Sequence, residues 1–104
     1  MQQDELKLSI LRKAETIGSQ RDLAKELGFS VGKINYVMNA LIDKGLIKVE
    51  NFATAKNKKS YCYLLTPKGL KEKMALTEKF IEIKKHEYHV LRDEFEKDIS
   101  MIND

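Results

Sequence analysis

The stretch "FSVGKINYVMNALIDKGL", residues 29–46, carries the signals of a helix at both of its ends. Ser30 is placed to cap the free amides of a first turn, and Gly45 stands where helices commonly end in a left-handed residue. The positions expected to face outward hold no acid: Gly32, Lys33, Asn35, Tyr36 and Asn39. An ordinary solvated helix has a mixture of Glu and Lys on this side. The sequence therefore predicts that a partner lies against this face.

The segment just before this helix predicts a shorter helix that packs against it. "SQRDLAKEL", residues 19–27, begins with Ser19 as N-cap and has Asp22 three residues later, which is a capping-box arrangement. Gly28 ends this helix, and its inward side is apolar: Leu23, Ala24 and Leu27. Two short helices joined by "GFS" form a helix-turn-helix unit, in which these residues pack on Ile34 and Met38.

The rest of the chain predicts one helix before this unit, and a hairpin and a long helix after it. Residues 4–17 have an apolar stripe at helical spacing, formed by Leu6, Ile10, Ala14 and Ile17. Residues 46–52 and 60–66 read as strands joined by the polar loop "ATAKNKK". Thr66 and Pro67 restart a helix as N-cap and first helical residue. Neither Gly nor Pro follows residue 70, which fits one long helix or two with a soft break.

The order of helix, helix-turn-helix and hairpin is the winged-helix plan. We therefore predict a mainly α fold with a small β-hairpin wing, namely a winged helix-turn-helix plus a long C-terminal helix. Residues 1–66 are expected to form a DNA-binding domain, and residues 67–104 a helix for dimerisation.

Two segments resemble the DNA-binding core of the MarR family of bacterial transcriptional regulators. They are "DLAKELGFSVGKINYVMNALIDKGLIKVE" and "NKKSYCYLLTPKG", and with their flanks they cover about half of the chain, residues 19–69. The small size and lone C-terminal helix are most similar to the EPS-associated subgroup, whose name links it to exopolysaccharide genes. Family wings typically carry an Asp-x-Arg element, where this chain has Asn57, Lys58 and Lys59. The longer helices that enclose a ligand pocket in other members are not matched here, so a small-molecule effector stays unknown.

The winged-helix plan gives the acid-free face a predicted role in a DNA major groove. Asn35 and Asn39 are expected to bond base edges, because an amide matches the two adjacent groups of adenine. Gly32 would permit close approach to a phosphate or base, Lys33 would place a charge near phosphate, and Tyr36 would bond a phosphate or contact a thymine methyl group. The predicted DNA-binding residues are Ser19, Gln20, Arg21, Ser30, Gly32, Lys33, Asn35, Tyr36, Asn39, Lys56, Asn57, Lys58 and Lys59. The alternatives are a solvated face, a protein-binding surface and, for Ser19, capping alone.

Charge and composition agree with a nucleic-acid partner without requiring one. The net charge of +3 is too small to decide, but no acid lies between Glu50 and Glu72, a span that holds five lysines. A solvated loop explains these lysines equally well. No apolar run is long enough for a membrane, the N-terminus does not resemble a secretory signal, and the single cysteine favours a reducing, cytoplasmic setting.

The sequence predicts no enzyme, cofactor or metal site. There is no phosphate-binding glycine loop and no Cys/His nucleophile pairing. Cys62 is interpreted as a small strand residue rather than a thiol switch, because no second thiol exists to resolve it. His86 and His89 are three apart and could approach one metal ion, but no third ligand is obvious.

The long C-terminal helix has an apolar stripe that its own chain does not need. The residues assigned to dimerisation are Ile81, Tyr88, Leu91, Phe95 and Ile102, which follow a four-three spacing. The helix would extend about 50 Å, more than the width of a domain of this size. An identical chain is the simplest partner for the stripe, and the alternative is a helical hairpin within one chain.

Overall fold

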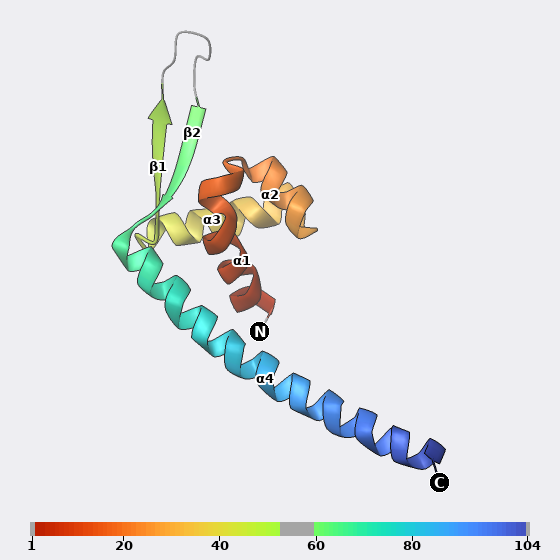
Figure 1. Ribbon diagram of the computed structural model, residues 1–104. Coiled ribbons are helices and arrows are strands. Elements are labelled where there is room, and N and C mark those ends of the chain that lie inside the picture. The colour runs from red at the N-terminus through yellow and green to blue at the C-terminus, as the bar shows by residue number, and fades with distance from the viewer. Residues whose placement is uncertain (1, 53–59, 104) are drawn as a thin grey trace. The chain divides into compact units, whose positions relative to one another are not determined.

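The computed structural model describes residues 2–52 and 60–103, and it has the predicted winged helix-turn-helix fold (Figure 1). Its elements are α1 (Gln2–Ile17), α2 (Gln20–Leu27), α3 (Val31–Asp43), β1 (Ile47–Phe52), β2 (Ser60–Leu65) and α4 (Pro67–Asn103). The fold prediction is therefore confirmed, element by element. The chain forms two compact units, Met1–Met74 and Ala75–Asp104, so α4 runs from the first unit into the second.

Both caps of the helix-turn-helix unit form at the predicted serines. The Ser19 hydroxyl oxygen accepts from the Asp22 amide at 3.1 Å, and the Ser30 hydroxyl oxygen accepts from the Lys33 amide at 3.1 Å. The Ser19 amide donates to the Ile17 carbonyl at 2.6 Å, so only one half of the predicted capping box forms. At the far end of α3, Gly45 has the left-handed φ of 74° that its position predicts.

The core of the first unit lies where α1, α2 and α3 meet. Its fully buried side chains include Ile10, Leu23, Ile34 and Met38, each with an exposed fraction of 0%. Ala24 is also buried, and its small side chain suits a close approach of α2 to α3. This packing orients α3 and decides which of its sides faces solvent.

The wing is a two-stranded antiparallel hairpin, in which Ile47 pairs with Leu65 and Val49 pairs with Tyr63. Ile47 and Tyr63 are buried. The Leu65 amide, at the end of β2, donates to Glu15 Oε1 on α1 at 2.9 Å, so a side chain of α1 contacts the base of the wing. Residues 53–59 lie outside the described residues, and the predictions for Lys56, Asn57, Lys58 and Lys59 fall there.

The helix α4 begins at the predicted position and continues without a break. The Thr66 hydroxyl oxygen accepts from the Gly69 amide at 2.9 Å, which makes Thr66 the N-cap ahead of Pro67. The 37 residues of α4 form one helix, so the alternative of a helical hairpin is wrong. None of the helices in the described part of the chain has the length and apolar character needed to cross a membrane.

Candidate nucleic-acid interface

One side of α3 is buried and the other is exposed, as its sequence predicts. The buried side consists of Ile34, Val37, Met38 and Leu41. The exposed side includes Gly32, Lys33, Asn35, Tyr36 and Asn39, with Val31 and Asp43 exposed at the two ends of the helix. Tyr36 is 67% exposed, which is high for an aromatic side chain. The structure thus brings the five predicted α3 residues together on one accessible face.

Lys33 and Tyr36 contact each other on this face. The Lys33 ammonium nitrogen lies 5.9 Å from the centre of the Tyr36 ring, which is within the range of a cation–π interaction. Ring and charge are therefore presented as a pair. The ammonium of such a pair suits a phosphate, and the ring suits a neighbouring apolar group such as a sugar or a thymine methyl group.

Three amide side chains form a row that joins α2 to α3. Asn35 Nδ2 donates to Gln20 Oε1 at 3.0 Å, and Asn39 Nδ2 donates to Asn35 Oδ1 at 3.2 Å. The sequence assigned Gln20 to phosphate and did not predict its contact with Asn35. The feature of the sequence that could have indicated this contact is the presence of an amide residue on each side of the turn of the helix-turn-helix unit. Whether they meet depends on the crossing angle of the two helices, which sequence does not show.

The start of each helix in this unit also carries predicted contacts. The oxygens of Ser19 and Ser30 are occupied by capping, but each hydroxyl proton remains free for an acceptor such as phosphate. Arg21 is exposed on the first turn of α2. At Gly32 an added Cβ would lie in open space, with the Ser30 oxygen as its nearest neighbour at 4.0 Å. The α3 start is thus unobstructed on this side.

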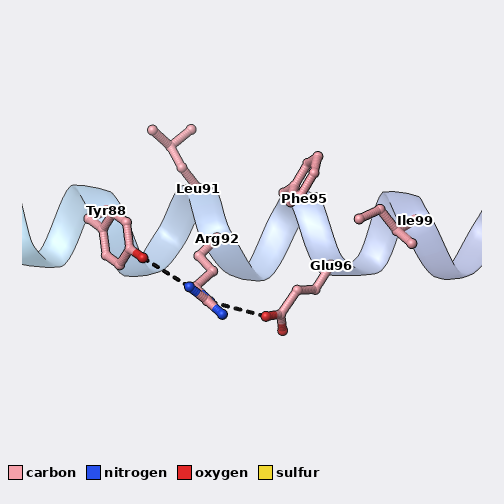
Figure 2. A pocket seen from close by; sticks show the side chains of 6 residues that line it. All are labelled: Tyr88, Leu91, Arg92, Phe95, Glu96 and Ile99. Carbon is pink, nitrogen blue, oxygen red and sulfur yellow. Dashed lines mark hydrogen bonds and ion pairs between the residues drawn. The ribbon is translucent and has the colours of Figure 1, made fainter.

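The predicted dimerisation residues all lie on α4 with exposed side chains. Figure 2 shows Tyr88, Leu91, Phe95 and Ile99 along this helix, lining a hollow whose described lining residues all belong to α4. Ile99, 41% exposed, was not assigned from sequence, although it follows Phe95 by four residues and so shares its side of the helix. Leu76 and Phe80, nearer the start of α4, are buried, whereas the residues of the stripe are exposed.

A polar chain of contacts borders this stripe. Arg92 Nη1 donates to the Tyr88 hydroxyl at 2.9 Å, and Arg92 Nε donates to Glu96 Oε1 at 3.1 Å (Figure 2). The hydrogen bond to Tyr88 and the bond and charge of Glu96 raise the pKa of Arg92 above its usual value. An arginine guanidinium is charged under all physiological conditions, and these contacts favour that charged form.

The remaining sequence candidates are Cys62 on β2 and His86 and His89 on α4. Cys62 is a free, half-buried thiol in β2. Within residues 2–52 and 60–103, no three His, Cys, Asp or Glu side chains gather closely enough to hold a metal ion. His89 instead packs edge-on against Tyr88, with ring centres 5.5 Å apart.

Comparisons with known proteins agree with this fold. Residues 8–48, from α1 to the start of β1, match the family described as "Winged helix-turn-helix DNA-binding". No curated protein matches the chain. Among solved structures, it is similar to the transcriptional regulator BldR from Sulfolobus solfataricus, at 24% identity and a TM-score of 0.65. That alignment covers 79% of this chain and 58% of BldR, so the chain spans little more than half of that relative.

Two further solved structures come from Staphylococcus aureus. The MepR–DNA complex aligns at 20% identity with a TM-score of 0.62, covering 97% of this chain and 78% of MepR. MarR in complex with salicylate and kanamycin aligns at 19% identity with a TM-score of 0.59, covering 99% of this chain and 68% of MarR. At these identities the likeness shows the fold, which is that of a winged helix-turn-helix.

Proposed function

We propose that this chain is a sequence-specific, DNA-binding transcriptional regulator of the MarR family that acts as a homodimer. The observation that carries the proposal is the exposed face of α3 from Gly32 to Asn39, which holds no acid and lies within a segment that matches winged helix-turn-helix DNA-binding proteins. A similar fold is bound to DNA in the MepR complex. The sequence resemblance further suggests the EPS-associated subgroup and the control of exopolysaccharide genes. Binding to chromosomal DNA also accords with the cytoplasmic location predicted from the sequence.

In this proposal α3 enters the major groove, and the two helix starts contact the backbone. Asn35 and Asn39 meet base edges, and Lys33 lies near phosphate. The hydroxyl of Ser19 and the exposed side chain of Arg21 contact the DNA backbone on one side of the groove. Residues 1–66 thus form the DNA-binding domain, and residues 67–104 hold two copies together.

The wing lysines are expected to contribute affinity without base discrimination. Replacing Lys58 and Lys59 by Ala should weaken binding to all duplex sequences alike. The slope of log affinity against log salt should fall by about 1 for each phosphate contact that is lost. Fluorescence anisotropy across a salt series measures both quantities, and Lys84→Ala/Lys85→Ala on α4 is the matched control. An unchanged slope in the wing variant would mean that the wing lysines do not contact DNA.

Replacing Gly32 by Ala is expected to separate stability from binding. Because the added methyl group meets open space and Ala favours helix, the free energy of unfolding should rise by about 0.5–1 kcal/mol. Affinity for DNA should nevertheless fall, because the methyl group occupies the space through which the start of α3 approaches DNA. Urea denaturation and anisotropy test the two effects. Higher stability with unchanged affinity would mean that Gly32 does not lie close to DNA.

The homodimer is proposed from the exposed stripe on α4. Ile81, Tyr88, Phe95 and Ile102 recur at every seventh residue, which is the spacing of a helix that packs along a partner helix. A single winged-helix module contacts few bases, and specific sites normally combine two half-sites about one helical turn apart. A second copy of the same chain supplies both the missing helix and the second reading face.

The experiment that tests the function is binding to random duplex DNA followed by selection of preferred sequences. We expect affinity to fall steeply with salt and the selected sequences to converge on a two-fold symmetric site. Absence of salt-dependent binding to any duplex would contradict the proposal. That result would favour the rival function, a winged-helix protein-interaction module that uses the same face.

A further inference from the structure

The row formed by Gln20, Asn35 and Asn39 is the part of the candidate interface that the proposed function does not yet explain. Its two hydrogen bonds run in one direction: Asn39 donates to Asn35, and Asn35 donates to Gln20. Gln20 is half-buried at the first residue of α2, whereas both asparagines are exposed on α3. The row therefore begins at a partly enclosed side chain and ends at an open one.

The donors and acceptors that remain differ between the two asparagines. An asparagine amide has two N–H donors and one oxygen that can accept two bonds. Asn35 uses one N–H and one of the two acceptor positions of its oxygen within the row. Asn39 uses only one N–H, so its oxygen and its other N–H stay free. Adenine presents an amino donor and the N7 acceptor side by side in the major groove, which an amide oxygen and an N–H can bond together.

The orientation of Asn39 depends on the rest of the row. The last torsion of an Asn side chain is broad and roughly two-fold, so a free amide can present its oxygen or its nitrogen to the groove. When Gln20 Oε1 accepts from the Asn35 nitrogen, the Asn35 oxygen is left to face Asn39. That oxygen in turn holds the Asn39 nitrogen, which leaves the Asn39 oxygen for a base.

We propose that Asn39 reads an adenine in the major groove and that Gln20 is a positioning residue which orients it through Asn35. The inference rests on the proposed DNA-binding function and names the base that this face selects. The Gln20 nitrogen takes no part in the row and remains available to a phosphate. Through Gln20, the contact of α2 with the DNA backbone is therefore coupled to the base that α3 prefers.

Three variants separate positioning from plain phosphate contact. Gln20→Met keeps the length of the side chain and removes both its amide oxygen acceptor and its N–H donors, whereas Gln20→Glu keeps the acceptor and removes only the donors. Asn39→Ala removes the reading amide. Affinity is measured by anisotropy for the site selected from random DNA and for the same site with each other base pair at the adenine position. NMR of the free protein follows the side-chain amide signals of Asn35, with backbone signals reporting the fold.

Asn39→Ala should reduce discrimination at one A·T position by about 5- to 150-fold. Gln20→Met should reduce discrimination at the same position by about 2- to 10-fold, and it should shift the Asn35 side-chain signals in the free protein. Gln20→Glu should retain discrimination at that position, because its oxygen still accepts from Asn35. It should weaken binding to all sequences alike, because its charge repels phosphate.

Two results would overturn the inference in distinguishable ways. Uniform weakening of all sequences by Gln20→Met, with discrimination intact, would make Gln20 a phosphate contact only. Unchanged Asn35 side-chain signals in Gln20→Met would mean that Gln20 does not hold the row in solution, whether or not the protein binds DNA. Failure of the unaltered chain to bind any duplex would instead contradict the proposed function itself.

Discussion

The double variant Leu91→Asp/Phe95→Asp is expected to sediment as a monomer at micromolar concentration, where the unaltered chain sediments as a dimer. In the single chain these side chains are 65% and 63% exposed, and the proposed second copy would bury them. Each aspartate would then place a carboxylate in an apolar seam between two helices. Burying an ionised group without a partner costs several kcal/mol, so two of them outweigh the contacts that the seam provides.

The same variant should keep the fold of the first unit. Both positions are exposed on a helix, so the free chain loses no buried contact, and the NMR signals of residues 19–46 should stay in place. Weak, salt-sensitive DNA binding should remain, whereas two-fold symmetric footprinting should disappear.

A matched control adds the same two charges on another side of α4. His86→Asp/Ser100→Asp changes two exposed residues outside the apolar stripe, and it should leave the dimer intact. Analytical ultracentrifugation of all three proteins compares them directly. If the Leu91/Phe95 variant remained dimeric at micromolar concentration, the interface would lie elsewhere.

Replacing Gly69 by Ala is expected to destabilise the first unit by about 3 kcal/mol, the upper end of the usual cost of overpacking. Gly69 lies in the first turn of α4, and an added Cβ would overlap the backbone carbonyl oxygen of Leu46. It would also lie 3.2 Å from Leu65 Cδ2. Backbone cannot move aside as a flexible side chain can, so the start of α4 must separate from the start of the wing.

That separation would break a local hydrogen-bond network. The Leu46 carbonyl accepts from the Thr66 amide at 3.1 Å, and the Thr66 hydroxyl donates to the Gly45 carbonyl at 2.6 Å. Because domains of this size have a free energy of unfolding of roughly 5–15 kcal/mol, this destabilisation would be a large share of the total stability. Urea denaturation measures it, with Gly32→Ala as the control in which the same methyl group meets open space. Equal stability of Gly69→Ala and the unaltered chain would contradict the close approach.

Features that depend on neighbouring residues follow from the sequence alone. The caps at Ser19, Ser30 and Thr66 form where they were predicted, because a capping side chain bonds an amide only three residues away. The apolar spacing also identified the buried and exposed sides of α3, since helical periodicity assigns them before any partner is known. The proposed roles of the exposed residues in DNA binding stay predictions.

Contacts between segments that are distant in sequence become visible in the folded chain and not before. The contact of Gln20 with Asn35 spans fifteen residues, and that of Glu15 with the Leu65 amide spans fifty. The sequence indicated only that Gly69 belongs to the start of a helix. The structure shows that the Leu46 backbone leaves no room for a side chain at this position. The physical reason is that these contacts depend on how helices cross and how closely backbones approach. Packing of the whole core sets both quantities, and local sequence signals do not.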